Sequence, residues 1–390
     1  MANSHQKINI VMFNMSSYSE WDKGVQNRNY HILQTLLLDE QVGKIIAIDY
    51  LPHTARRFLR NLKENIVEHK GYRILEKTLL TKVLEVSNRL VIYSSVLSKI
   101  SSAKFYFKLN QFLANLNFND FVIWSYYPLE VGYFEKMPKA KLFVFDAVDH
   151  WAKHPSYRKF KNLLQKNYKI IDERADLIFI VAEELHHLFS HQENVFWFPN
   201  GVDLKHYQQE FNIINRDIGS LPRPIVGYSG IVQERFDTDL FKYLVKQNPD
   251  KSFVIIGPFW QKSIKKRLSR YSNIYFLGRK SYQEIPMYLQ QFDVGIIPHK
   301  VDQFIQYTNP MKMYEYLACG KPVVATPVSG INQFKELIYS TADYNQFNKY
   351  LNQSLKEDSL KFKEQRLEAI KEHSWLKRVD KMLELIKQRI

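Results

Sequence analysis

The feature that most constrains the fold is a series of short apolar runs, separated by helical patterns, that occurs twice along the chain. In the N-terminal half the runs are Ile8–Phe13, Lys44–Tyr50, Phe121–Trp124, Lys141–Phe145 and Leu177–Val181. Short continuous apolar runs are typical of parallel strands that are buried on both faces of a sheet. Because helical patterns alternate with them, this half of the chain is predicted to be built from βαβ units.

The second series begins after a poorly patterned stretch, 204–224, which we expect to carry the chain into a new domain. Its runs are Pro224–Tyr228, Ser252–Ile256, Asn273–Leu277, Val294–Pro298 and Pro322–Thr326. A chain of 390 residues is too long for one ordinary core and suits two α/β domains. We therefore expect Rossmann-like domains over 1–198 and 199–372. A charged amphipathic helix over 373–390 is expected to pack back toward the first domain.

Cysteine content and hydropathy limit the class of protein further. The single cysteine, Cys319, excludes a disulfide framework and a cysteine-based metal cluster. The first residues carry no signal-peptide core, and no apolar stretch approaches the roughly 18 residues that span a bilayer. The sequence therefore predicts a cytoplasmic protein.

The net charge of +15 requires an explanation in terms of partners. Lys and Arg crowd residues 53–112, where Leu, Ile, Val and Phe lie between them. This pattern fits a basic amphipathic helix that rests on an anionic membrane, and it fits equally a solvated helix face of a basic protein. Nucleic acid also matches the charge, but the chain has no helix-turn-helix, zinc-finger or RNA-recognition signature.

One segment, 308–326, carries the clearest chemical signal. Asn309 is a favoured helix N-cap, Pro310 suits the first helical position, and Gly320 is a fitting helix stop. The predicted helix would start at the carboxyl ends of the preceding strands, where open α/β sheets bind their ligands.

The start of this helix is predicted to bind a nucleoside diphosphate. Free N–H groups of Met311, Lys312 and Met313 and the charge of Lys312 favour a diphosphate there. Glu315 lies one turn along the same face, where its carboxylate would accept hydrogen bonds from the hydroxyls of a ribose. The alternative is an ordinary capped surface helix with a Lys312–Glu315 ion pair.

The run from Glu315 to Val324, Glu-Tyr-Leu-Ala-Cys-Gly-Lys-Pro-Val-Val, resembles the donor-site helix of family-4-type retaining glycosyltransferases. The resemblance implies the α/β GT-B fold, with two Rossmann-like domains and a cleft between them. It also implies a nucleotide-sugar co-substrate and retention of configuration, with no metal or other cofactor. The family's second glutamate of an E-x₇-E pair binds the donor ribose and corresponds to Glu315. The first falls on Tyr307, which departs from the pattern.

Further matches extend this resemblance over much of the chain. The Pro-Asn-Gly-Val-Asp of 199–203 is similar to the family's interdomain segment, and 227–230 is similar to its first C-domain strand and turn, with Gly230 at the donor. Arg235 matches the basic residue that the family places against the diphosphate, where a fork of donors would stabilise the leaving group. A surface ion pair with Asp237 or Glu234 is the alternative. The Asp237-Thr238-Asp239 triplet is interpreted as a helix cap.

The remaining candidates follow other strands. Arg279 to Tyr282 are expected at the nucleotide base, and Gly24 and Arg28 at the donor phosphates. Asp149, or its neighbour His150, would orient the acceptor hydroxyl or contact the donor sugar, with a helix N-cap as the alternative for Asp149. The expected catalytic residues are Asp149, Arg235 and Lys312, and the expected donor-binding residues are Gly24, Arg28, Gly230, Arg279, Tyr282, Asn309, Met311, Lys312, Met313 and Glu315, without a metal site.

The sequence thus predicts a hexosyltransferase-type enzyme that moves a sugar from a nucleoside-diphosphate sugar, with UDP favoured, to a lipid-linked or polysaccharide acceptor. The Asn-Pro-x-Lys before Tyr-Glu-Tyr is similar to a branch associated with bacterial cell-surface polysaccharides, including teichuronic-acid-type enzymes. A peripheral position on the inner face of the cell membrane would suit such an acceptor. A GT-B epimerase, a catalytically silent nucleotide-binding homologue and a charge-driven nucleic-acid binder remain as alternatives.

Overall fold

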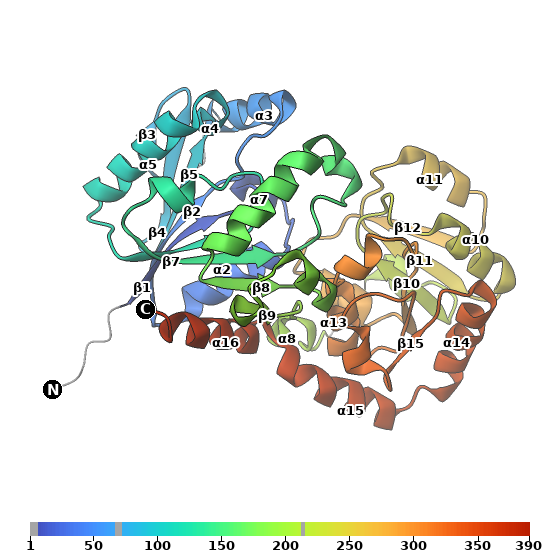
Figure 1. Cartoon of the computed structure of the whole chain (residues 1–390). Coiled ribbons are helices and arrows are strands. Elements are labelled where there is room, and N and C mark those ends of the chain that lie inside the picture. Colours follow the sequence, from blue (N-terminus) through green and yellow to red (C-terminus); the bar gives the residue numbers. More distant parts are fainter. Residues whose placement is uncertain (1–6, 67–71, 212–214) are drawn as a thin grey trace. The chain divides into compact units, whose positions relative to one another are not determined.

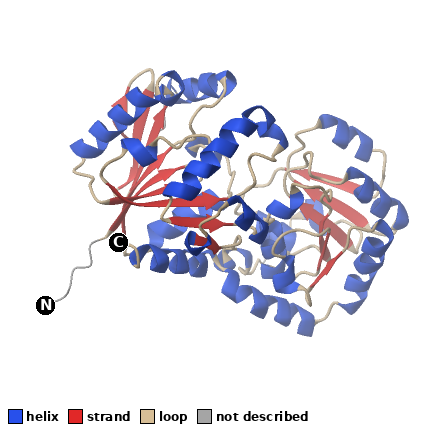
Figure 2. Ribbon diagram, in the orientation of Figure 1, coloured by secondary structure: helices blue, strands red, loops and turns tan. Residues whose placement is uncertain are grey.

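The computed structural model describes residues 7–66, 72–211 and 215–390 (Figure 1). The chain divides into two compact units. Unit 1 comprises Met1–Val181, Leu185–Phe198 and Val379–Ile390, and unit 2 comprises Ala182–Glu184 and Pro199–Arg378. Figure 2 shows strands flanked by helices in both units. Across the described residues, no helix has the length and apolar character needed to span a membrane.

Unit 1 is built on one sheet with the strand order β3-β4-β5-β2-β1-β6-β7-β8-β9. Its strands are β1 Ile8–Phe13, β2 Val42–Ile48, β3 Arg73–Lys77, β4 Thr81–Ser87, β5 Leu90–Ser95, β6 Phe121–Ser125, β7 Ala140–Ala147, β8 Leu177–Ile180 and β9 Val195–Trp197. Neighbouring strands pair in parallel along the part of the sheet that runs β5-β2-β1-β6-β7-β8-β9. The predicted βαβ construction is therefore confirmed.

Strand β4 pairs antiparallel with β3 on one side and with β5 on the other. These strands lie in the basic region 53–112, for which the sequence analysis predicted a helical pattern, and they correct that prediction. Charged residues occupy both faces of β3, which is mostly exposed, so its alternation of apolar and polar residues is weak. Among the described residues of this region, helices form only at its two ends. The helices of unit 1 are α1 Tyr18–Asp22, α2 Arg28–Leu38, α3 Ala55–Ile66, α4 Leu97–Ile100, α5 Ser102–Asn115, α6 Tyr133–Lys136 and α7 Lys161–Arg174.

Unit 2 holds a second parallel sheet, with the strand order β12-β11-β10-β13-β14-β15. Its strands are β10 Ile225–Ser229, β11 Ser252–Ile256, β12 Ile274–Gly278, β13 Val294–Ile297, β14 Val323–Ala325 and β15 Ile338–Ser340. The chain reverses its direction of travel across the sheet between β10 and β13. This is the switch point at which sheets of this type bind ligands beyond the carboxyl ends of the strands.

The helices of unit 2 are α8 Leu204–Tyr207, α9 Arg216–Gly219, α10 Thr238–Gln247, α11 Lys262–Leu268, α12 Ile285–Leu289, α13 Met311–Ala318, α14 Tyr344–Glu357 and α15 Leu360–Ala369. The stretch 204–224, expected to be poorly patterned, therefore contains α8 and α9. The last helix, α16 Trp375–Lys387, begins in unit 2 and ends in unit 1. Its predicted apolar stripe of Trp375, Val379, Leu383 and Ile386 is buried.

Two glycines inside the sheet of unit 2 make room for aromatic rings. Gly227 and Gly295 are paired in register on β10 and β13. A Cβ at Gly227 would lie 2.2 Å from the ring of Phe292, and one at Gly295 would lie 2.4 Å from the ring of Tyr316. Gly227 and Gly295 therefore allow these two strands to pack against aromatic rings.

Candidate functional site

The segment before α13 is fixed by asparagine side chains. Asn309 Oδ1 accepts a hydrogen bond from the Asn200 N–H at 2.8 Å, and Asn309 Nδ2 donates to the Ser329 carbonyl at 2.8 Å. The Asn200 amide returns a bond to the Asn309 carbonyl at 2.6 Å. The N-cap position belongs to Pro310, so the expectation that Asn309 caps the helix is wrong. Asn309 instead sets the path by which the chain enters α13.

The motif at 199–203 has a local physical reason at each of its last four residues. Asn200 holds Asn309, and Gly201 leaves room for the chain at His373, whose carbonyl would lie 3.0 Å from a Cβ. The N–H of Val202 donates to that carbonyl at 3.0 Å. Asp203 caps α8 by accepting from the His206 N–H at 3.1 Å. The motif therefore connects the start of unit 2 to the start of α13.

The end of α13 is a Schellman motif. Gly320 has a φ of +69°, and its N–H donates to the Leu317 carbonyl at 2.9 Å, while the Lys321 N–H donates to the Tyr316 carbonyl at 2.9 Å. Gly320 is therefore the helix stop that the sequence predicts.

The free N–H groups at the helix start are fewer than expected. The Met313 N–H donates to the Pro310 carbonyl at 3.2 Å, and the Met313 side chain is fully buried. The expected contribution of Met313 is therefore wrong. In the described part of the chain, the N–H groups of Met311 and Lys312 have no acceptor. These two donors and the helix dipole favour an anion at this point.

Lys312 reaches from α13 to the glycine turn that follows β10. Its Nζ lies 5.2 Å from the centroid of the Tyr228 ring, and a Cβ at Gly230 would lie only 3.4 Å from that Nζ. Gly230 has a φ of +139°, and its N–H donates to the Ile256 carbonyl at 2.8 Å. The structure thus brings together Gly230 and Lys312, which lie far apart in the sequence, at the switch point of the sheet.

The charge on Lys312 is poorly compensated. Burial and the nearby Arg235 lower the pKa of Lys312 to about 8, and Glu315 opposes them. No direct ion pair between Lys312 and Glu315 is found in the described ranges. A cation placed where water solvates it poorly, beside a second cation, favours binding of an anion.

Arg235 lies in the loop between β10 and α10. The Gln233 side-chain oxygen, assigned from its hydrogen-bonding partners, accepts from Arg235 Nε at 2.9 Å and from Nη2 at 3.1 Å. The Arg235 carbonyl accepts from the Lys300 N–H at 2.8 Å, which ties this loop to the end of β13. Within the described residues Arg235 forms no ion pair with Asp237 or Glu234, so the surface ion-pair alternative is wrong.

Asp237 has a structural role instead. Its Oδ1 accepts hydrogen bonds from the N–H groups of Asp239 at 3.0 Å and Leu240 at 2.9 Å, which makes it the N-cap of α10. The Tyr344 hydroxyl donates to the other carboxylate oxygen at 2.9 Å. The interpretation of the Asp237-Thr238-Asp239 triplet as a helix cap is confirmed.

Glu315 lies one helical turn beyond Lys312 and meets a group of aromatic residues. Burial raises the pKa of the Glu315 carboxyl, while Lys312 and a hydrogen bond from the Tyr207 hydroxyl lower it. The ring of Tyr282 lies 6.2 Å from that of Tyr207 and stacks on His206 at 3.7 Å between ring centres. Tyr207 therefore links the expected ribose residue to an expected base residue. Arg279 follows Gly278 in the exposed turn at the end of β12.

His299 is a site residue that the sequence analysis missed. It follows β13 at the switch point, it is 1% exposed, and neither ring nitrogen has a hydrogen-bond partner in the described structure. Burial, followed by the charges of Lys312 and Arg235, lowers the pKa of His299 well below its usual value. Its position at the carboxyl end of an apolar run is a signal that would have identified it. Tyr307, by contrast, is buried in the turn before α13.

Gly24 is explained by the helix before it. Its φ is +79°, its N–H donates to the Trp21 carbonyl at 2.8 Å, and the Val25 N–H donates to the Glu20 carbonyl at 2.9 Å. Gly24 is therefore the left-handed residue of a Schellman motif that ends α1.

Arg28 is engaged inside unit 1. It begins α2, it is 3% exposed, and its Nε donates to Asp146 Oδ1 at 2.9 Å, in an ion pair with a fully buried carboxylate. This corrects the expectation of a charge available to a donor phosphate, because the charge of Arg28 is compensated within the core.

Asp149 lies half-buried in the loop after β7. The next helical turn, at 155–160, is capped by His154, so the alternative that Asp149 is a helix N-cap is wrong. The Asp149 carbonyl accepts from the Trp151 N–H at 3.0 Å and from the Tyr168 hydroxyl at 3.3 Å, which fixes its backbone.

Comparison with known proteins accounts for this arrangement in unit 2. Residues 234–356 match the family described as glycosyl transferases group 1. This part of unit 2 is therefore similar to the group 1 glycosyl transferases. The matched residues include Arg235, Arg279 and the whole of α13.

The curated proteins that the chain resembles are distant. The chain is 28% identical over 207 residues to the teichuronic acid biosynthesis glycosyltransferase TuaH of Bacillus subtilis, and the match covers 50% of this chain and 52% of TuaH. It is 29% identical over 109 residues to an uncharacterized glycosyltransferase of Methanocaldococcus jannaschii, a match that covers 23% of this chain and 30% of that protein. The chain thus spans about half the length, or less, of these curated relatives.

Comparison with solved structures shows that the chain has the GT-B fold. Anabaena HepE in complex with UDP and glucose matches with a TM-score of 0.66 at 14% identity, over 97% of this chain and 99% of HepE. The sucrose-phosphate synthase of Thermosynechococcus elongatus gives 0.68 at 16% identity, over 98% and 99%. TarM of S. aureus, in a complex that contains UDP, gives 0.62 at 13% identity, over 97% and 99%.

Proposed function

We propose that the protein is a group 1 glycosyltransferase that transfers a sugar from a UDP-sugar to a lipid-linked or polysaccharide acceptor with retention of configuration, in bacterial cell-surface glycan synthesis. The observation that carries the proposal is the position of Lys312 in unit 2. Its ammonium group lies beside the Gly230 turn and in the field of Arg235, at the start of α13 and at the switch point of the sheet.

The diphosphate of the donor would lie beside Lys312 and Arg235 at the start of α13, and we call this group the cationic corner. As the bond between the sugar and the diphosphate breaks, negative charge grows on the leaving group, and donors already in place stabilise that charge. Arg235 supplies a planar fork of N–H donors, and Lys312 supplies a point charge. The N–H groups of Met311 and Lys312 add backbone donors at the positive end of the helix dipole.

The nucleoside would extend from the diphosphate along α13. The Glu315 carboxylate, one turn further, would accept hydrogen bonds from the ribose hydroxyls, and Tyr207 holds it in position. Arg279 and Tyr282 would lie at the base, at the end of β12. Asn309 would not contact the donor, and would position the start of α13 through its hydrogen bonds to Asn200 and Ser329.

The identity of the donor and of the glycan is supported by the relatives. HepE and TarM have both been solved with UDP, which favours UDP over GDP for this chain. The teichuronic acid role named for TuaH favours a bacterial cell-surface glycan.

Unit 1 would supply the acceptor side, with Asp149 orienting the acceptor hydroxyl and Gly24 bringing backbone toward the donor. A lipid-linked acceptor would bring the enzyme to an anionic membrane surface on the inner face of the cell membrane.

The direct test is consumption of a panel of UDP-sugars and GDP-sugars by the full chain, with membrane lipid extract as the source of acceptor. We expect release of UDP and formation of a glycolipid with retained anomeric configuration, followed by nuclear magnetic resonance. Arg235→Ala should lower kcat by about 10²- to 10³-fold, as loss of one donor to a developing oxyanion does. Lys349→Ala, at an exposed lysine of α14, is the matched control and should leave the rate unchanged.

Other outcomes select the alternatives. Isomerisation of the UDP-sugar without transfer would make the protein an epimerase of the same fold. Binding of UDP without consumption of any sugar nucleotide would make it a silent homologue.

A further inference from the structure

Helix α3 of unit 1 exposes apolar side chains on its outer face and buries polar ones on its inner face, beside the half-buried Phe58 and Leu62. Its buried residues are the polar Asn61 and Asn65, at 2% and 1% exposure. Its exposed residues include Leu59 at 63% and Ile66 at 59%. A surface helix of a globular protein normally turns its apolar residues inward and its polar residues outward.

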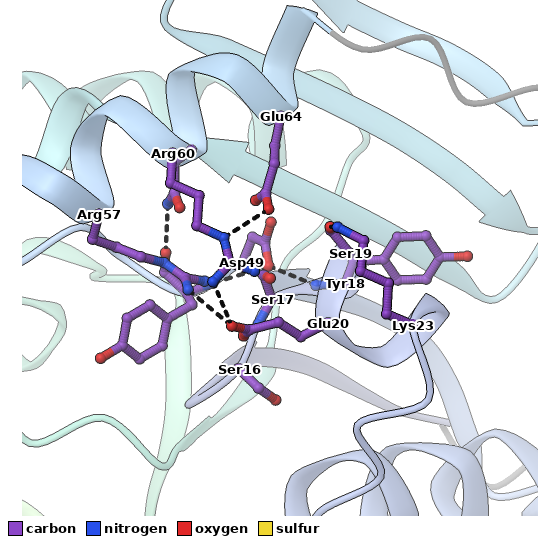
Figure 3. Close-up of polar contacts among 12 residues, drawn as sticks. Ser16, Ser17, Tyr18, Ser19, Glu20, Lys23, Asp49, Arg57, Arg60 and Glu64 are labelled. Atoms are coloured by element: carbon purple, nitrogen blue, oxygen red, sulfur yellow. Dashed lines mark hydrogen bonds and ion pairs between the residues drawn. The ribbon is translucent and has the colours of Figure 1, made fainter. Parts of the chain in front are cut away.

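The inner face of α3 is held by polar contacts, as Figure 3 shows. Arg57 Nη1 lies 3.1 Å from Glu20 Oε1, and Arg60 Nη1 lies 3.0 Å from the same oxygen. Arg60 Nε also pairs with Glu64 at 3.0 Å. Asn61 Nδ2 donates to the carbonyl of Tyr50 at 2.8 Å. These contacts fix the rotation of the helix about its axis, so Leu59 and Ile66 do not turn inward.

The outer face of α3 combines apolar and basic side chains. Arg56, Leu59, Lys63 and Ile66 recur at helical spacing and are all exposed. The acidic residue of the helix, Glu64, belongs to the inner network.

Neighbouring elements extend this face. The turn between β3 and β4 exposes Lys77 and Leu79, the latter at 64%, and α4 exposes Lys99 and Ile100, the latter at 54%. We call the set of Arg56, Leu59, Lys63, Ile66, Lys77, Leu79, Lys99 and Ile100 the α3 face.

Hydrogen bonds show that the elements of the α3 face adjoin one another. Lys82 Nζ of β4 donates to the Glu64 carbonyl at 2.7 Å near the end of α3. The N–H of Val96, the cap of α4, donates to the Leu80 carbonyl at 2.9 Å. Lys99 Nζ donates to the His53 carbonyl at 3.2 Å just before α3. Figure 1 shows α3, α4 and β3 gathered at the same end of unit 1.

We propose that the α3 face is a docking surface for an anionic lipid bilayer, with Leu59, Ile66, Leu79 and Ile100 entering the interface and the lysines and arginine contacting lipid phosphates. Exposed apolar side chains interspersed with cations are what such an interface binds. A second copy of this chain would place like charges together, because the charged side chains of the face are all cations. Nucleic acid would be attracted by the cations and would gain nothing from the exposed leucines and isoleucines.

This inference does not rest on sugar transfer, and its test uses neither donor nor acceptor. The full chain is co-sedimented with vesicles of phosphatidylcholine containing phosphatidylglycerol, and with vesicles of phosphatidylcholine alone. We expect binding to the anionic vesicles that exceeds binding to the neutral ones by at least about tenfold, since each surface cation adds to the attraction. Absence of binding to the anionic vesicles would overturn the proposal.

Paired variants separate the two components of the face. Arg56→Glu with Lys63→Glu should weaken binding by at least about tenfold. Its matched control, Lys349→Glu with Lys361→Glu, makes the same change of charge at exposed positions of unit 2 and should have a smaller effect. Leu59→Ser with Ile66→Ser should also weaken binding, whereas Leu38→Ser with Leu360→Ser, at positions 74% and 78% exposed, should not.

Three results contradict the proposal. The first is an effect of the charge variant no larger than that of its control. The second is vesicle binding that Leu59→Ser with Ile66→Ser leaves unchanged. The face would then be a site for any polyanion, and duplex DNA would compete with the vesicles. The third is a wild-type protein that forms a dimer and does not bind vesicles, with Leu59→Ser and Ile66→Ser together converting the dimer to a monomer. Unchanged circular dichroism and thermal unfolding of both face variants, measured without nucleotide, report that they are folded and keep this test separate from the proposed function.

Discussion

At the scale of single residues, the buried charge of Lys312 makes a prediction about pH. Its pKa is lowered to about 8 in the unliganded protein, so the ammonium group loses its proton as the pH rises from 7 to 9. A bound diphosphate favours the charged form, and UDP binding above pH 8 therefore requires uptake of a proton. The dissociation constant for UDP should rise by up to about tenfold for each pH unit above 8.

The matched variant for this prediction is Lys312→Arg, which stays charged throughout this range. Its dissociation constant, measured by isothermal titration calorimetry from pH 7 to 9.5, should change much less than that of the wild type. A wild-type constant that does not change over this range would contradict a role for Lys312 in holding the diphosphate.

The glycine turns beside Lys312 give a second prediction at this scale. Gly257 has a φ of +134°, and a Cβ there would lie 2.2 Å from the Gly230 carbonyl oxygen. Gly278 has a φ of +69°, but a Cβ there would meet nothing within 4 Å. Gly278→Ala should therefore cost only the backbone strain, about 1 kcal/mol. Gly257→Ala should cost several times more and should weaken UDP binding, because the Gly230 turn must move.

Chemical denaturation of the two glycine variants, together with UDP titration, measures both effects. Equal losses of stability in Gly257→Ala and Gly278→Ala would show that the close approach of the two turns does not constrain the site.

Single residues also show what the sequence can and cannot predict. Lys312 and Glu315 were predicted because they lie in a local motif whose spacing has a chemical meaning. Arg235 was predicted from the resemblance to a known family alone. Tyr207 was missed because its contact with Glu315 joins distant segments, which no local pattern encodes. Arg28 was assigned to the donor because its partner, Asp146, lies far away in the sequence.

At the scale of elements, the start of α13 depends on Asn309. Asn309→Ala would remove the acceptor of the Asn200 N–H and the donor to the Ser329 carbonyl, and would leave buried polar groups without partners. We expect a loss of about 2 kcal/mol in the free energy of unfolding and weaker UDP binding. Denaturant unfolding with and without UDP measures both.

The control for Asn309→Ala is Asn345→Ala, which removes the acceptor of an exposed hydrogen bond from Tyr243. It should change neither quantity appreciably. Unchanged UDP affinity in Asn309→Ala would mean that the entry into α13 does not position the anion site.

Most of the buried strands were predictable from the sequence, but β5 is a fully buried strand that was missed inside the basic region. The parallel strands of both units are continuous apolar runs, and the structure confirms those that were predicted. The strands β3 and β4 were missed because they carry Lys, Arg and Glu among their apolar residues. The region of α3 was recognised as basic and amphipathic, but the sequence alone did not show that Leu59 and Ile66 face outward. That orientation depends on Glu20 and Tyr50, which belong to other elements.

At the scale of the whole molecule, repetition of the same pattern in the two halves predicted two sheets, and length supported this number. The net charge of +15 predicted an anionic partner without saying where it binds. The structure shows two separate basic regions that could attract an anionic partner. A cationic corner in unit 2 suits a nucleoside diphosphate, and a basic, apolar face in unit 1 suits a lipid surface.

The central claim is that a nucleoside diphosphate binds at the start of α13. The measurement that tests it most directly is thermal and chemical stability of the full chain with UDP, GDP and ADP, for the wild type, Lys312→Ala, Glu315→Ala and the control Lys349→Ala. We expect UDP to raise the free energy of unfolding of the wild type and the control by about 2.7 kcal/mol at a hundredfold excess over the dissociation constant, and to do so in neither site variant. No stabilisation by any of the nucleotides, or equal stabilisation of Lys312→Ala, would contradict the claim.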